Sequence, residues 1–450
     1  MRRLAIPALI IALLAPYGAG AQQQAGKDSV YEELNLFDEA FERIRQDSVD
    51  PVTDTKLIGA AIAGMLSGLD PHAAYLDPAA LKAHQASDTS EAPDVGLVVT
   101  IVNGEPKVIS PRDGSPAAEA GIKPGDLIFS IDKQPTYELS LAEIEQKLRG
   151  PAGSTVALVL RRGTGGPIRL ALKRAVIAAP SVTARVVEGN LGYVRLAGFD
   201  SRTQAALAAA IQQLRQQTGG KLAGLVLDLR NDAGGNFDAA VTVADAFLDK
   251  GDVAVVKARK PGSLKHIAAT PGDLVKGLPI VALVNGGTAR EAELVAGALQ
   301  DNHRAILLGT KTFGESAIET LIPLGSGGAI QLTTKRFATP TGREIDGKGL
   351  EPDLTVTPLK LQKLAHEEVL HEADLPGALK NPDQATLGKT PAPAAKPAPA
   401  GAPPGATATP PPKTAPSVAT GEIGGADDEQ LTQALDVLRG LAVFNRRASG

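Results

Sequence analysis

Residues 223–235 read Ala-Gly-Leu-Val-Leu-Asp-Leu-Arg-Asn-Asp-Ala-Gly-Gly, and this stretch decides the fold. Its first seven residues are mostly apolar, which is typical of a strand buried on both faces of a parallel sheet. The polar residues that follow, and the pair Gly234-Gly235, predict a loop at the carboxyl end of that strand. Ligand sites of open α/β sheets gather at this edge. Functional side chains are therefore expected first in this loop.

Strands and helices alternate on both sides of this stretch, across residues 176–358. The apolar periodicity predicts further strands at 191–196, 278–284 and 306–308, and helices at 203–217, 237–248 and 291–300. This β-α-β order predicts an α/β core whose strands are mostly buried.

Two other kinds of unit precede this core. Residues 86–175 contain short strands separated by Gly and Pro turns, and so predict an inserted β-rich domain. Residues 28–85 are expected to form a helical N-terminal segment. A heptad-like apolar stripe runs along its first part and fits either ordinary core packing or a seam with a partner helix. The stripe consists of Val30, Leu34, Phe37, Phe41 and Ile44.

The two ends of the chain have different characters. Residues 1–21 combine a positive start, an apolar run and an Ala-Gly-Ala cleavage pattern, which are the features of a signal peptide. We therefore expect export to the periplasm or the extracellular space, with no membrane span after cleavage. Residues 390–426 are rich in Pro and Ala and predict a disordered linker. Residues 427–445 predict a last helix with one apolar face.

The composition excludes several kinds of chemistry. The 450-residue chain has no cysteine, which excludes disulfides, thiolate metal sites and a Cys nucleophile. Its net charge is −4 and its aromatic content is 3%, so no nucleic-acid partner is expected. His366 and His371 are five residues apart and would lie on different faces of a helix, so they do not form a zinc-protease pair. We expect no metal and no cofactor.

Four blocks of sequence together resemble one protein family. They are Leu69-Asp70-Pro71-His72 with Tyr75-Leu76-Asp77-Pro78; Gly121-Ile122-Lys123-Pro124-Gly125-Asp126; Asp228-Leu229-Arg230-Asn231 with Gly234-Gly235; and Ala296-Gly297-Ala298-Leu299-Gln300-Asp301 with Thr312-Phe313-Gly314. Their order and spacing resemble the C-terminal processing peptidases, or tail-specific serine proteases, from about residue 30 to residue 358. The resemblance implies that residues 86–175 are an embedded PDZ domain and that residues 176–358 are a tail-specific-protease-like core.

The catalytic positions implied by the resemblance carry other residues. The family uses a Ser nucleophile, a Lys general base and a Gln that orients the Lys. The matching positions here are Arg290, Glu315 and Glu319. An Arg has no nucleophilic oxygen and stays protonated, so no catalytic residue is expected to be intact. Arg290 is expected to pair with Glu315, or with Glu319 instead, unless the side chains point into solvent.

Neighbouring residues keep an active enzyme open as an alternative. Thr288 and Ser316 carry hydroxyls close to the altered positions, and Lys311 is four residues before Glu315. A Ser or Thr paired with a Lys would make a substitute nucleophilic centre. The candidate oxyanion donors are Gly234 and Gly235, although the preceding Asp232-Ala233 replaces the Asn-Pro that the family usually has.

The peptide-binding loop of the PDZ domain resembles the family pattern more closely. Val95, Gly96 and Leu97 match the loop whose backbone amides hold the carboxylate of an extended peptide. Asp94 stands where the family usually has Gly, and its charge disfavours a carboxylate at close range. Both peptide binding and a purely structural PDZ fold fit this pattern.

Three functions therefore fit the sequence. The first is an exported pseudopeptidase that binds protein C-termini, unfolded protein or partner proteins without cutting them. It would form homo-oligomers, or hetero-oligomers with an active relative, through the N-terminal stripe and the last helix. The second is an active serine-type endopeptidase that uses non-standard residues. The third is a structural remnant of an enzyme.

Overall fold

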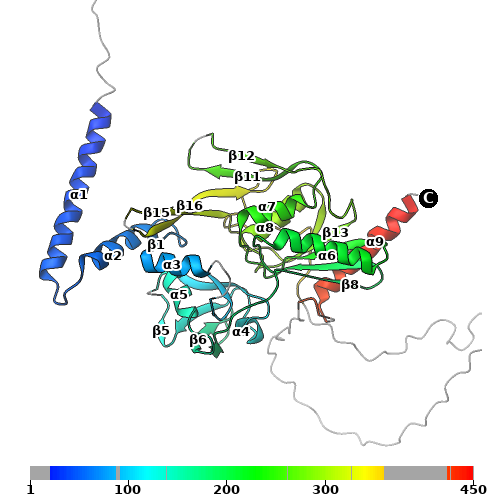
Figure 1. The fold of residues 1–450 in the computed structure, drawn as a ribbon, viewed down its shortest axis with the longest axis horizontal. Helices are drawn as coiled ribbons and strands as arrows, with labels where there is room; N and C mark the ends of the chain where they lie inside the picture. The colour runs from blue at the N-terminus through cyan, green and yellow to red at the C-terminus, as the bar shows by residue number, and fades with distance from the viewer. Residues whose placement is uncertain are drawn as a thin grey trace, which may run out of the picture.

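The computed structural model describes residues 21–87, 92–137, 139–260, 262–325, 327–358, 423–425 and 427–448. Most of the expected signal peptide and linker, together with His366 and His371, lies outside these residues. Figure 1 shows a core in green and yellow, a smaller domain in cyan and green beside it, and helix α1 extending away.

A six-stranded sheet lies at the centre of the core. Its strand order is β17-β14-β13-β10-β9-β8, and all neighbours are parallel except β8 and β9. The strands are β8 (Val182–Val187), β9 (Leu191–Leu196), β10 (Gly224–Asp228), β13 (Ile280–Val284), β14 (Ala305–Gly309) and β17 (Leu354–Thr355). Every residue of β9, β10 and β13 is buried, as expected for strands covered on both faces.

Helices cover both faces of this sheet. They are α6 (Thr203–Gln217), α7 (Phe237–Asp245), α8 (Glu291–Asp301) and α9 (Glu429–Ala448). The first three pack in one large apolar cluster with one face. On the other face, Leu431, Leu435 and Leu438 of α9 pack in a second cluster with Val226 and Val281. The last helix is thus an integral part of the core.

The core contains a second, antiparallel sheet, which was not predicted from the sequence. Its order is β1-β16-β11-β12, and β15 also pairs with β16. The strands are β1 (Ala74–Leu76), β11 (Asp252–Ala258), β12 (Lys265–Ala268), β15 (Ala317–Pro323) and β16 (Ala329–Ala338). β15 and β16 are only partly buried, so they lack the continuous apolar runs of the central strands. Because β1 pairs with β16, this sheet joins the N-terminal segment to the core.

The inserted domain has its own sheet, ordered β2-β3-β4-β6-β7 with β5 paired to β4. Its elements are β2 (Leu97–Val102), β3 (Glu105–Pro111), α4 (Pro116–Glu119), β4 (Leu127–Ile131), β5 (Gln134–Pro135), α5 (Leu141–Leu148), β6 (Thr155–Arg161) and β7 (Pro167–Lys173). β2 lies at the edge of the sheet and packs against α5. Asp113 of this domain accepts two hydrogen bonds from Arg195 of the core, at 2.9 and 3.0 Å.

The N-terminal segment forms α1 (Ala21–Asp47), α2 (Asp54–Ser67) and α3 (Pro78–Ser87). Val30, Leu34, Phe37 and Ile44 of the apolar stripe are exposed, so they do not pack into the core of this chain. Ordinary core packing therefore does not account for them, and the partner-helix seam stays a prediction. Among the described helices, none combines the length and the apolar character that a membrane crossing needs.

A buried ionic network connects the central sheet to α9. Asp228, at the end of β10, is fully buried and accepts hydrogen bonds from Arg230 and from the hydroxyl of Tyr193. Arg195 lies 3.9 Å from the same carboxylate. Arg230 also donates to both carboxylate oxygens of Asp428, at 2.9 and 2.6 Å, at the start of α9.

Replacing Asp428 with Ala removes one partner of a buried charge. We expect Asp428→Ala to lower the free energy of unfolding by about 3 kcal/mol, because Arg230 keeps its burial and loses two hydrogen bonds. Urea denaturation of the purified chain measures the change. The matched control is Asp436→Ala on the solvent side of the same helix, where the pair with Arg439 is exposed and worth at most about 1 kcal/mol. Equal effects at the two sites would contradict the prediction.

Candidate functional site

Two loops meet at the carboxyl ends of the parallel strands β10 and β13. Thr288, in the second loop, donates from Oγ1 to the carbonyl oxygen of Leu229 in the first, over 2.8 Å. Asn285 Nδ2 donates to Asn231 Oδ1 over 2.8 Å. These bonds fix the loop after β10 against the turn that leads into α8, at the edge where the sequence predicts the functional site.

Arg290 occupies the sharp turn between β13 and α8. Its φ of 53° and ψ of −122° lie in a region that non-glycine residues rarely adopt, at a cost on the order of 1–3 kcal/mol. Glu293 holds this turn: its Oε2 accepts the N–H groups of Arg290 (3.1 Å) and Glu315 (2.9 Å), and its Oε1 accepts that of Gly314 (2.8 Å). One buried side chain therefore fixes the backbone at both Arg290 and Glu315.

Arg290 forms both of the ion pairs that were predicted as alternatives, one with Glu315 and one with Glu319. Arg290 Nε lies 3.5 Å from Glu315 Oε1, and Arg290 Nη2 lies 3.4 Å from Glu319 Oε1. Glu291, the next residue in the chain, adds a third carboxylate at 3.9 Å. The side chain points into the cluster and not into solvent, because only 26% of it is exposed.

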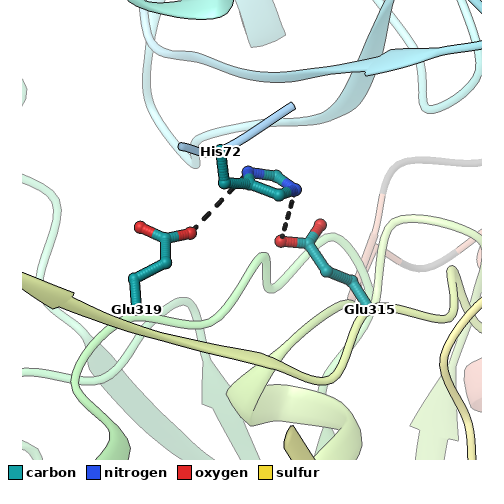
Figure 2. A group of neighbouring side chains, drawn as sticks. All are labelled: His72, Glu315 and Glu319. Atoms are coloured by element: carbon teal, nitrogen blue, oxygen red, sulfur yellow. Dashed lines mark ion pairs between the residues drawn. The ribbon is translucent and has the colours of Figure 1, made fainter. Parts of the chain in front are cut away.

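His72 completes this cluster, and its position was not predicted from the sequence. Its Nε2 lies 3.3 Å from Glu315 Oε1 and its Nδ1 lies 3.7 Å from Glu319 Oε1, so the ring stands between the two carboxylates (Figure 2). Asp70 shapes the loop by accepting the N–H groups of His72 and Ala73, both at 2.9 Å. Because β1 pairs with β16, the loop before β1 lies against the core.

Charge and burial act against each other in the cluster. Burial raises the pKa of Glu315 above its usual range, and the neighbouring Arg290 and His72 only partly oppose this. Burial disfavours the charged form of Arg290, but the carboxylates of Glu291, Glu315 and Glu319 outweigh it and raise its pKa. Arg290 is therefore a permanent cation in this cluster.

The two candidate oxyanion donors are already engaged in this structure. Gly234 donates its N–H to Asp232 Oδ1 and Gly235 donates its N–H to Glu291 Oε2, both at 2.9 Å. A side chain of the same chain thus occupies each donor that a substrate oxygen would need.

The residues of the alternative nucleophilic centre are engaged elsewhere. The hydroxyl of Thr288 is fully buried and donates to a backbone carbonyl. Lys311 is half exposed and its Nζ pairs with Glu351 at 2.7 Å. Ser316 is buried directly after Glu315. These contacts do not assemble a hydroxyl–amine pair.

The predicted peptide-binding loop is closed in this structure. Val95, Gly96 and Leu97 are all buried. The N–H of Gly96 donates to Asp94 Oδ1 over 2.7 Å, and Arg112 lies 3.4 Å from the other oxygen of that carboxylate. Asp94 therefore takes the place that the carboxylate of a bound peptide would need at this amide.

Comparisons with known proteins agree with this architecture. Peptidase family S41 matches residues 190–356, a PDZ domain matches residues 107–162, and the activating protease CtpB N-terminal domain matches residues 16–80. A carboxy-terminal-processing protease of Bartonella bacilliformis is 40% identical over 365 residues, which cover 80% of this chain and 84% of that protein. The chain belongs to peptidase family S41.

Other members of family S41 support the same assignment. The carboxy-terminal processing protease CtpA of Bacillus subtilis is 32% identical, over 74% of this chain and 71% of its own. The solved structure of a photosystem II D1 C-terminal processing protease superposes with a TM-score of 0.63 at 31% identity, covering 72% of this chain and 92% of that one. The predicted family, the α/β core and the PDZ domain are thus confirmed.

Asp232 leads to a prediction about stability and pH in this S41 chain. Its side chain is fully buried, its Oδ2 has no hydrogen-bond partner, and burial raises its pKa to about 8. A raised folded-state pKa means that this group costs stability as pH rises from about 4 towards 8. Asp232→Asn keeps the acceptor for Gly234 and removes the charge. We expect the free energy of unfolding of Asp232→Asn, measured relative to the native chain, to increase by about 1–3 kcal/mol from pH 4 to pH 8.

Urea denaturation at both pH values checks this expectation. The control is Asp238→Asn, an exposed side chain in the first turn of α7. If Asp232→Asn and the native chain differ in free energy of unfolding by the same amount at pH 4 and at pH 8, the carboxyl group does not titrate in this interval.

Proposed function

We propose that this chain is an exported pseudopeptidase of family S41 that binds protein C-termini or partner proteins without cutting them. The observation that carries the proposal is Arg290, held in the turn before α8 and paired with Glu315 and Glu319. The family pattern has Ser, Lys and Gln at these positions. An arginine side chain supplies no nucleophilic oxygen, and a guanidinium cannot give up its proton to become a base.

Two further contacts support the loss of catalysis. The N–H groups of Gly234 and Gly235 are bonded to carboxylates, so they are not free to stabilise an oxyanion. The hydroxyl of Thr288 and the amine of Lys311 have other partners, which disfavours an enzyme with substitute residues. In this proposal, ion pairs occupy the former active site and block it.

The peptide-binding role is supported by the PDZ domain. β2 is an edge strand and α5 packs beside it, the arrangement to which an extended peptide adds as a further strand. The closed loop at Gly96 limits the affinity, since a peptide carboxylate must displace Asp94. The exposed stripe on α1 is the surface through which we expect assembly with a second copy or with an active relative. Export is proposed from residues 1–21.

Restoring the family residues tests the loss of catalysis. We expect the native chain not to cleave an unfolded protein or a peptide with an apolar C-terminus. The triple variant Arg290→Ser, Glu315→Lys, Glu319→Gln should cleave both, at roughly 10²-fold or more above background, because it regains a nucleophile and a base. Adding Asp232→Ala should raise the rate further, because it removes the side-chain oxygen that accepts the amide of Gly234.

The control for this experiment is the same triple variant with Arg290→Ala, which has the base but no hydroxyl. Cleavage by the native chain that disappears in Thr288→Ala, Ser316→Ala or Lys311→Ala would sink the pseudopeptidase proposal. It would identify the substitute centre instead.

Removing the carboxylate of Asp94 tests the peptide-binding role. Asp94→Gly frees the N–H of Gly96 and removes the repelling charge, so we expect about tenfold tighter binding of a peptide with an apolar C-terminus. Fluorescence anisotropy of a labelled peptide measures the affinity. An amidated peptide is the control and should gain much less. If Asp94→Gly leaves both affinities unchanged, the loop does not bind carboxylates.

A further inference from the structure

His72, Glu315 and Glu319 come from two distant parts of the chain and meet beside Arg290 (Figure 2). His72 lies on the loop before β1, whereas Glu315 precedes β15 and Glu319 lies on it. One nitrogen of the histidine and one oxygen of each carboxylate all lie within 4.8 Å of one another. All three side chains are at least four-fifths buried.

The charges of this cluster do not balance without a further cation. Three carboxylates, those of Glu291, Glu315 and Glu319, surround the single guanidinium of Arg290. When all three carboxylates are ionised, the single guanidinium compensates only one of their three charges. Buried charges require compensation by pairing or by a metal ion, and a divalent cation would supply it fully.

Glu315 adds an independent observation. The residue is 5% exposed, yet neither of its carboxylate oxygens has a hydrogen-bond partner. The nearest nitrogens of Arg290 and His72 are Arg290 Nε at 3.5 Å and His72 Nε2 at 3.3 Å, and both are too far or too poorly aligned for a hydrogen bond. The side chain points at His72 and Glu319, into the centre of the cluster (Figure 2).

We infer that His72, Glu315 and Glu319 form a binding site for a divalent ion of the Zn²⁺ type. One imidazole nitrogen and two carboxylate oxygens are ligands that Zn²⁺ accepts at about 2.0–2.2 Å, whereas Mg²⁺ and Ca²⁺ prefer oxygen ligands alone. Three protein ligands leave the fourth position for water. At these bond lengths the ligand atoms must approach to about 3.3 Å of one another, so the side chains rotate inward on binding.

Such an ion would connect two units of the fold. His72 belongs to the N-terminal segment and the two glutamates belong to the core, and the described contacts between these units include the short pairing of β1 with β16. Metal binding therefore stabilises the attachment of the N-terminal segment. The inference goes beyond the proposed function and does not rest on it, because its test measures binding and not cleavage.

The test is titration of the full chain, stripped with a chelator, with Zn²⁺ in a calorimeter and in thermal unfolding. We expect one equivalent to bind and the unfolding midpoint to rise with the Zn²⁺ concentration. His72→Ala, Glu315→Gln and Glu319→Gln should each weaken binding at least tenfold. Mg²⁺ at the same concentration should neither bind nor compete. Co²⁺ in place of Zn²⁺ should give a visible absorption band that His72→Ala abolishes.

Two controls exclude binding elsewhere. His266→Ala removes an exposed histidine that lies 2.6 Å from the single carboxylate of Asp252. The double variant His366→Ala, His371→Ala removes two further histidines, which are five residues apart in the sequence. Both should bind Zn²⁺ as the native chain does. Should Glu315→Gln fail to fold, His72→Gln and Glu319→Gln decide the question, since these two side chains are nearer the surface.

The inference is overturned if the native chain takes up no Zn²⁺ at 10⁻⁴ M, about the weakest binding that a three-ligand site would give. It is equally overturned if His72→Ala binds as tightly as the native chain, or if only the double histidine variant loses binding. In those cases His72 contacts Glu315 and Glu319 without a metal ion between them.

Discussion

The fold depends on the carboxylate of Asp228, which is buried at the end of β10. Burial alone would disfavour its charge, but Arg230 and Arg195 outweigh burial and keep its pKa below the usual range. Each arginine also reaches another unit: Arg195 holds Asp113 of the PDZ domain, and Arg230 holds Asp428 of α9. Because a buried charge cannot lose its partners cheaply, this network fixes three units around one strand end.

The same strand edge explains why the site around Arg290 is well ordered. Glu293 fixes the backbone of the turn before α8, whichever side chain that turn carries. The turn therefore holds the side chain of Arg290 in one place. Glu315 and Glu319 lie within 3.5 Å of this cation, so the three side chains are compatible with one another as a set.

The parts predicted from the sequence are those with a strong local signal. The central strands are continuous apolar runs, such as Leu225–Leu227, and α9 has a clear apolar face. Strands β15 and β16 of the second sheet were missed because they are partly exposed and have no such run. The pair Arg290–Glu315 followed from a motif. The approach of His72 depends on β1 pairing with a strand about 255 residues later, which no local pattern contains.

Helix α9 has a consequence for the order in which the protein is made. The sheet face that it covers includes Val226 and Val281, which are fully buried and pack in one cluster with leucines of α9. A ribosome completes β10 and β13 well before it reaches residues 429–448, so this apolar face stays uncovered while the residues between β13 and α9 are made. The core therefore becomes complete only after α9 has emerged. Until then the nascent chain exposes apolar surface, which favours aggregation.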